Sequence, residues 1–227
     1  MNNRTQGYLL LLFGGALLRL ATGNLLLRYV RPVARPWVLL AGLALLLLAL
    51  GRLFQAHRAD RRQHPPRSAT VRTGWLLMAP VLAILVISPP ALGSYSATRA
   101  PVGIPLSEHK DFPALAGTSP HHLPLLDFTT RVLWDSGRTL QNQQVQLTGF
   151  VLNDRPDGFV LARLVITCCA ADARPVEVEI RTGQRPARDG WVQVTGTLTG
   201  VDPVATSFPV LTARSVRPID QPTNPYD

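Results

Sequence analysis

Charged residues are scarce in this chain of 227 residues, because they make up 16% of the sequence where soluble domains usually carry about 25%. Hydrophobic residues make up 46%, which excludes an intrinsically disordered protein and disfavours a fully soluble one. Aromatic residues account for only 7% and form no series along neighbouring strands on which nucleic-acid bases could stack. The composition therefore favours a protein that is partly embedded in a membrane.

Acidic residues are nearly absent from the first half of the chain. Residues 1–107 contain twelve arginines and one acid, Asp60, whereas residues 108–227 carry a net charge of −2. The overall net charge of +9 therefore belongs to the apolar half, as is typical of membrane topology signals and not of a nucleic-acid-binding surface. We expect the lipid bilayer as a partner and no nucleic acid.

Three long apolar runs predict three transmembrane helices, at residues 8–27, 36–54 and 75–92. Each run is 18 to 20 residues long, which at about 1.5 Å per residue covers a hydrocarbon core of about 30 Å. A cleaved signal peptide is disfavoured for the first run, because only Arg4 precedes it and no A-x-A site follows.

Arginines in the loops between these runs predict the orientation. The second loop carries six arginines and the first loop carries three, so the positive-inside rule places the N-terminus and the second loop in the cytoplasm. Everything after residue 92 then lies outside. We expect a multi-pass protein of the plasma membrane with an extracytoplasmic C-terminal domain.

Two polar residues interrupt the first predicted span. Arg19 lies near its middle, where a cation costs a few kcal/mol or more without a partner, and Asn24 follows it. Both could face a polar pathway or another subunit, or Arg19 could instead extend its guanidinium to the membrane surface. Because the three predicted spans contain no acidic residue, a transport path would require a second polypeptide.

The second half of the chain predicts a linker and a β domain. Residues 93–124 are rich in Ser, Pro, Gly and Ala and predict an extracytoplasmic linker. Residues 125–227 predict a short amphipathic helix, Leu125–Trp134, followed by strands with a period of two. The five predicted strands are residues 145–151, 158–169, 175–181, 191–201 and 208–216. Their number and spacing, with glycines inside two of them, favour a small OB-like five-stranded barrel.

The only two cysteines of the chain are adjacent, at Cys168 and Cys169. A disulfide between them would be strained, because neighbouring Cα atoms lie about 3.8 Å apart and ordinary disulfides need about 4.4 Å or more. Three interpretations stay open: small hydrophobic residues in the barrel wall, redox-active or intermolecular thiols, and metal ligands. As metal ligands they would bind zinc together with Asp172 and with His121 or His122.

Signatures of catalysis are missing. The chain has no CxxC motif, no Ser/His/Asp arrangement in a recognisable context and no Gly-rich phosphate loop. We therefore expect a protein that is not an enzyme.

Several strings in this sequence resemble the bacterial YcgQ-like membrane proteins, which are described as permease subunits. The strings are RLVITCCAADARPVEV (163–178), GFV (149–151), WVQVTGTL (191–198), PPALG (89–93) and NPY (224–226). The resemblance implies a multi-span membrane region followed by a β-rich domain, and a larger multi-span permease-like protein as a partner. It implies no catalytic or ligand residues, so the Cys168, Cys169 and Asp172 hypothesis depends on their chemistry alone.

Two functions follow as expectations. The first is an accessory subunit of a two-component permease, with its β domain outside the membrane. The alternative is a membrane-anchored module that binds or senses zinc through the CC-x-x-D motif.

Overall fold

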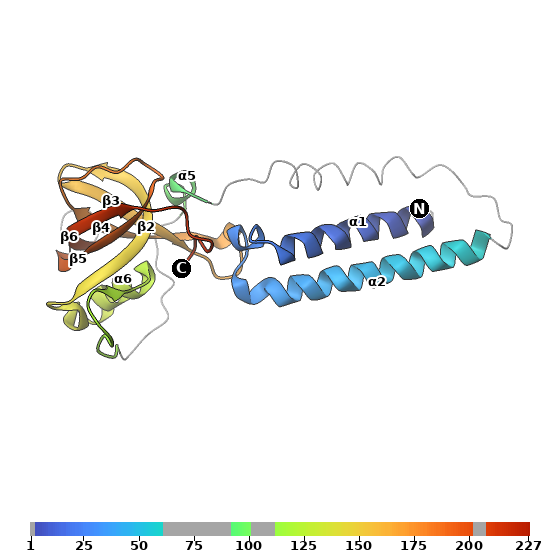
Figure 1. Ribbon diagram of the computed structural model, residues 1–227, viewed down its shortest axis with the longest axis horizontal. Coiled ribbons are helices and arrows are strands. Elements are labelled where there is room, and N and C mark those ends of the chain that lie inside the picture. The colour runs from blue at the N-terminus through green and yellow to red at the C-terminus, as the bar shows by residue number, and fades with distance from the viewer. Residues whose placement is uncertain (1–2, 61–91, 101–111, 202–207) are drawn as a thin grey trace. The chain divides into compact units, whose positions relative to one another are not determined.

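The computed structural model describes residues 3–60, 92–100, 112–201 and 208–227. The chain divides into two compact units, Met1–Pro90 and Ala91–Asp227. Figure 1 shows that the first contains long helices and the second a curved sheet with short helices. We call them the helical unit and the β unit.

In the described part of the helical unit, residues 3–60, the chain forms two helices and two short 3-10 turns (Figure 1). In chain order they are α1 (Asn3–Thr22), η1 (Leu26–Arg28), η2 (Pro32–Ala34) and α2 (Arg35–Asp60). Helix α1 ends directly before Gly23, a residue type that disfavours helix interiors. Arg35 then caps it, because its Nε donates to the Ala21 carbonyl at 2.7 Å and its Nη2 to the Thr22 carbonyl at 3.2 Å. These bonds satisfy carbonyls that the end of α1 leaves without helical partners.

Small residues let α1 and α2 pack closely. A Cβ atom added to Gly14 would lie 3.0 Å from the Gly42 carbonyl oxygen, and one added to Gly42 would lie 2.9 Å from the Leu18 side chain. Glycine at both positions therefore permits a backbone approach that larger residues would prevent.

The helical unit supports one of the three expected spans directly. Residues Pro32–Arg58 form a helical stretch of 27 residues with a mean hydropathy of 2.2, long and apolar enough to cross a membrane. The apolar part of α1, Gln6–Thr22, is shorter and extends about 26 Å, below the hydrocarbon thickness of about 30 Å. The expectation of a helix through residue 27 was wrong, because the chain turns after Thr22. The expected span at 75–92 lies almost wholly outside the described residues.

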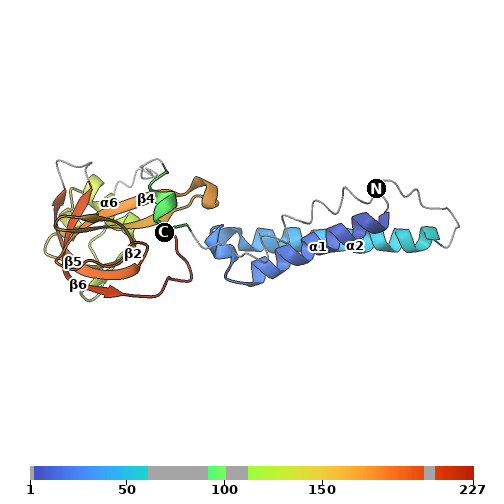
Figure 2. The same cartoon turned by 90° about the horizontal axis from the view of Figure 1, so that it is seen from above.

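The described residues of the β unit form six strands and four short helices, and Figure 2 shows this unit from a second side. Its helices are α5 (Ser94–Ala97), α6 (Leu125–Trp134), η3 (Arg138–Leu140) and η4 (Ala170–Asp172). Its strands are β1 (His121–His122), β2 (Gln144–Arg155), β3 (Gly158–Val165), β4 (Arg174–Arg181), β5 (Trp191–Val201) and β6 (Pro209–Pro218).

Strand β2 pairs with three other strands of the sheet. The order in the sheet is β1-β2-β3-β4-β6-β5, and β2 also pairs with β5. The β1–β2 and β4–β6 pairs are parallel and the others are antiparallel. The all-β expectation is confirmed, but the sheet has six strands instead of five, because His121–His122 pairs along β2.

Strand β3 is buried on both faces, which explains its continuous apolar sequence. Phe159 and Leu161 point into the main core beneath α6, whereas Val160, Ala162 and Leu164 point into a second cluster. The second cluster also includes Ala97 and Tyr226, which lie near the two ends of the unit, and Phe150, Leu152 and Ile166 from the middle of its sequence. Leu92, Ala173 and Trp191 pack against it.

The helix Leu125–Trp134 and the strand Trp191–Val201 have the bounds expected from their periodicity. The expected linker at 93–124 contains α5 and β1. The largest difference concerns the strand expected at 158–169, which ends at Val165. Both cysteines therefore lie in the following loop and not in the sheet.

Candidate metal centre

The loop between β3 and β4, residues 166–173, carries both cysteines, and we call it the Cys loop. Ile166 and Ala173, at its two ends, pack in or against the second cluster. Between them the chain leaves the sheet and forms η4, with the Asp172 amide donating to the Cys169 carbonyl at 3.0 Å. Buried apolar residues thus anchor both ends of a loop whose middle faces outward.

Asp172 determines the shape of this loop. Its Oδ1 accepts the backbone amide of Thr167 at 2.8 Å, and its Oδ2 accepts the backbone amide of Cys168, also at 2.8 Å. These amides therefore bind a carboxylate in place of a neighbouring strand, which explains why β3 ends before them. Backbone amides that turn around an anion, here the Asp172 carboxylate, are common in protein loops.

The turn brings the two thiols together. The Sγ atoms of Cys168 and Cys169 are 3.6 Å apart, and both sulfurs lie within 4.8 Å of a carboxylate oxygen of Asp172. Two sulfurs bound at about 2.3 Å to a tetrahedral zinc ion lie about 3.8 Å apart. The sulfur separation is therefore close to that of two sulfur ligands of one zinc ion.

The protonation states of the loop follow from these contacts. The hydrogen bond between the Cys168 thiol and the Asp172 carboxylate, with a smaller effect of Cys169, raises the pKa of Cys168 to about 11. The same thiol and the loop amides lower the pKa of Asp172 to about 2. At neutral pH the site is thus a thiol beside an ionised carboxylate, and a divalent cation would take the place of the thiol proton.

The two histidines do not join this group. Within the described residues, the cluster of potential metal ligands contains Cys168, Cys169 and Asp172 only. His121 is 9% exposed, and its Nε2 lies 3.2 Å from the Gln143 Oε1, within hydrogen-bond distance. His122 follows it on β1 with its side chain exposed. The expected ligand set therefore separates into a thiol–carboxylate cluster and a histidine pair elsewhere in the unit.

Arg19 and Asn24 belong to the helical unit. Arg19 is exposed in the last turn of α1, where the helix dipole favours a cation. Asn24 is exposed just beyond the end of this helix. Because α1 ends at Thr22, Arg19 lies near a helix end and not near the middle of a span.

A buried polar junction at the C-terminus was missed by the sequence analysis. Arg163 donates through Nη2 to the carbonyls of Asn224 at 2.9 Å and Tyr226 at 3.2 Å, and its Nε forms an ion pair with the Asp227 carboxylate at 2.9 Å. Its guanidinium also lies 5.7 Å from the centre of the Trp191 ring. Three of the strings quoted above therefore meet here, since Arg163 begins one, Trp191 begins another and Tyr226 ends the third.

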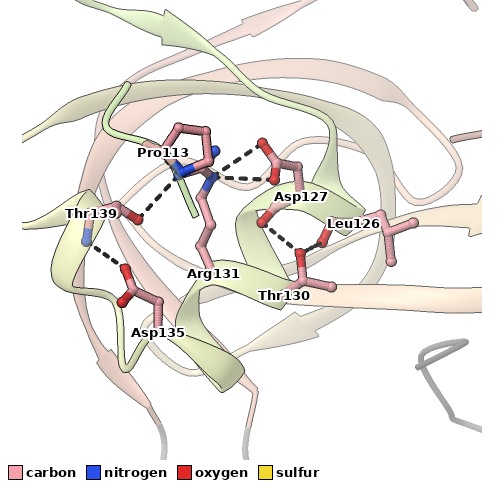
Figure 3. A network of polar contacts seen from close by, with 7 residues as sticks. All are labelled: Pro113, Leu126, Asp127, Thr130, Arg131, Asp135 and Thr139. Carbon is pink, nitrogen blue, oxygen red and sulfur yellow. Dashed lines mark hydrogen bonds and ion pairs between the residues drawn. The ribbon is translucent and has the colours of Figure 1, made fainter. Parts of the chain in front are cut away.

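A second missed network surrounds Arg131 on α6, which is 7% exposed (Figure 3). Its Nε donates to the Asp127 carboxylate at 3.2 Å, and its Nη1 donates to the Pro113 carbonyl at 2.9 Å and to the Thr139 hydroxyl at 3.2 Å. Arg131 thereby ties α6 to the segments before and after it. With His121 it also lines an open pocket of about 300 Å³.

Comparison with known proteins finds a match for the C-terminal part of the chain. Residues 130–226 match the DUF1980 C-terminal domain, a range that includes strands β2 to β6, the Cys loop and Tyr226. No curated protein and no solved structure matches the chain. The match is consistent with the resemblance found in the sequence, but it does not extend to the YcgQ-like membrane family as such.

Proposed function

We propose that this protein is a membrane-anchored module whose β unit binds a divalent cation of the zinc type. One observation carries the proposal. The Cys168 and Cys169 sulfurs are 3.6 Å apart, and both lie within 4.8 Å of an Asp172 carboxylate oxygen. Sulfur and carboxylate donors together suit zinc, and a separation of 3.6 Å is too short for a linear ion, which would need about 4.6 Å at the same bond length.

The anchoring part of the proposal is supported by α2. Its candidate span is only 11% buried, and an apolar helix exposed on most of its surface is typical of a membrane span. The arginine counts of the loops favour a cytoplasmic N-terminus and an extracytoplasmic β unit in the plasma membrane. We retain three spans in this proposal, with residues 75–92 as the third.

The fold part of the proposal is an OB-like barrel. It is supported by the pairing of β2 with both β3 and β5, which closes five strands into a ring of pairings to which β1 is added. A closed ring leaves few free strand edges. We propose a binding role and no enzymatic one for this scaffold.

The proposal is tested by the zinc content of the full-length protein purified in detergent. We expect about one zinc ion per chain, with most of it lost in Cys168→Ser and in Cys169→Ser because each variant removes one of two sulfur donors. His121→Gln and His122→Gln are matched controls that should retain zinc. Unchanged zinc in both cysteine variants would contradict the proposal.

The pH dependence of zinc affinity gives a second test. Because the hydrogen bond to Asp172 raises the pKa of Cys168 to about 11, this thiol is protonated below that pH and each bound ion must displace its proton. The affinity should therefore rise at least about tenfold for each pH unit between pH 6 and pH 9. An affinity that does not change over this range would exclude the Cys168 thiolate as a ligand.

A second candidate function is an accessory subunit of a two-component permease. The observation that favours it is the outward apolar surface of α2, where Leu40, Leu47 and Phe54 are 57%, 61% and 67% exposed. Such a surface can contact lipid or the helices of a larger multi-span protein. Mild extraction from native membranes followed by native mass spectrometry would reveal a permease-like partner. Transport by the purified protein alone in liposomes would contradict an accessory role.

A further inference from the structure

We infer that the Cys loop is an exchange site, in which the chain supplies three donors and a neutral nitrogen donor from another molecule completes the coordination of the ion. This inference rests on the proposed zinc binding and adds how the ion enters and leaves.

All three donors come from one short outward-facing loop. Cys168 is exposed, and Cys169 and Asp172 are half-buried. In the part of the chain that the structure describes, no fourth His, Cys, Asp or Glu lies close enough to join them. Structural zinc sites have four protein ligands, whereas sites that react with another molecule keep one position open. Among the residues that the structure describes, the Cys loop has the second arrangement.

Hydrogen bonds within the protein hold the loop in its shape. Asp172 holds the amides of Thr167 and Cys168 through its two oxygens, and each oxygen retains a further lone pair for a metal. The sulfurs of Cys168 and Cys169 lie within 4.8 Å of a carboxylate oxygen of Asp172, so one cation could contact all three side chains. Binding as two thiolates exchanges the Cys168 and Cys169 thiol protons, both released to solvent, for the ion, and it leaves the backbone of the loop in place. A site that needs little rearrangement can load and unload without unfolding.

Charge favours a neutral fourth donor. Two thiolates and one carboxylate around Zn²⁺ give the centre a net charge of about −1. A further thiolate would raise this to about −2 on an exposed surface, whereas an imidazole nitrogen leaves it unchanged. We therefore expect the incoming or outgoing carrier of the ion to present a histidine-like nitrogen.

Cobalt spectroscopy on the full-length protein in detergent tests this coordination, with Co²⁺ as the probe and free imidazole as the added donor. We expect sulfur-to-cobalt charge-transfer absorption before imidazole is added. Imidazole should then shift the d–d bands in a saturable manner while the charge-transfer absorption persists. If the d–d bands do not move, or if imidazole abolishes the charge-transfer absorption, the inference is overturned.

Release kinetics give an independent measure. If the fourth position is open, a chelator can bind the ion before it leaves, so a tenfold higher chelator concentration should accelerate zinc release about tenfold. Release that is independent of chelator concentration would show a closed site and overturn the inference. Asp220→Asn, which alters an exposed carboxylate outside the cluster, is the control and should release zinc as the parent protein does.

These outcomes are distinguishable from a failure of the proposed function. A protein that binds one zinc ion per chain but releases it at a rate independent of chelator retains the function and loses the exchange site. A protein that binds neither zinc nor cobalt loses both. Asp172→Asn provides a further check, because it should weaken cobalt binding while Cys168 and Cys169 still produce charge-transfer absorption.

Discussion

In the helical unit, many large apolar side chains of α2 are exposed, whereas in the β unit side chains of the same types are buried in the core. Leu43 and Leu50 of α2 are 51% and 56% exposed, but Leu147 and Leu161 of the β unit are fully buried. Leucine therefore has opposite environments in two units of one chain. The difference supports the proposed membrane anchor, because an apolar medium accommodates exposed leucines whereas water favours their burial.

We expect the two units to differ also in how well they tolerate substitutions. In α2 the outward leucines can exchange with one another at little cost, because lipid or a partner helix accepts any apolar shape. In the β unit, buried polar contacts and close backbone approaches allow few alternatives. The comparison predicts that substitutions in the β unit have larger effects than substitutions of similar size in the helical unit.

The largest effect is expected for Gly196→Ala in β5. A Cβ atom at this position would overlap the Thr212 carbonyl oxygen of β6, and a backbone atom in a paired strand cannot move away. We expect a loss of about 4 kcal/mol of unfolding free energy for the β unit. Gly183→Ala is the matched control, because a Cβ there would meet nothing within 4 Å. Limited proteolysis with mass mapping should find new cleavages within 130–226 for Gly196→Ala only.

The next effect is expected for Arg163→Met, which leaves the buried Asp227 carboxylate without its cation and the tail carbonyls without a donor. We expect a loss of about 3 kcal/mol, measured as a lower thermal midpoint of the full-length protein in detergent. Arg181→Met is the control. Because Arg181 is 48% exposed and lies 3.5 Å from Glu179, its loss should cost less than about 1 kcal/mol.

The pH dependence of this variant tests the cause. Burial raises the pKa of Asp227, and the nearby Arg163 opposes the increase. A carboxyl whose pKa is higher in the folded state is stabilised by its proton, so its contribution to stability falls as the pH rises through the folded pKa. Arg163→Met should therefore recover part of its lost stability in acid. A thermal midpoint that keeps falling below pH 5 relative to the parent would contradict this explanation.

A smaller effect is expected in the helical unit for Gly14→Leu. Its side chain would enter the contact with Gly42 and Leu46, where a Cβ already lies 3.0 Å from each, and overpacking of this kind costs about 2 kcal/mol. Gly15→Leu should be neutral, because a Cβ at Gly15 meets nothing within 4 Å. In a chain without native cysteines, cross-linking of Gly7→Cys to Leu53→Cys should fall with Gly14→Leu and remain with Gly15→Leu. Equal yields would show that α1 and α2 do not pack through Gly14.

Periodicity predicted the parts of the fold that depend on local pattern. The bounds of α6 and β5 follow from their apolar spacing, since each buries one regular face. The two-residue strand β1 could not be predicted, because its pairing with Val145 and Gln146 is a tertiary contact. The end of β3 at Val165 could not be predicted either, because it depends on where the Asp172 carboxylate lies.

The candidate site was predictable to the extent that its members are close in sequence. Cys168, Cys169 and Asp172 lie within five positions, so a single turn can bring them together. His121 and His122 are far away in the chain, and only the fold shows that they lie on β1 beside Gln143. The junction of Arg163 with Tyr226 also joins distant segments, and no local pattern encodes it.

The smallest effect is expected at the Cys loop itself, where Asp172→Asn should make Cys168 more reactive toward iodoacetamide. The hydrogen bond to the carboxylate raises the pKa of Cys168 to about 11, so its removal should lower this pKa toward the ordinary range and increase the thiolate fraction at pH 8 about a hundredfold. A less basic thiolate is also less nucleophilic, which cancels about tenfold of the gain. The net acceleration should therefore be about tenfold, measured by mass spectrometry of the alkylated peptide in metal-free protein. Asp220→Asn should leave the rate unchanged, and slower alkylation in Asp172→Asn would mean that the carboxylate activates the thiol instead of protecting it.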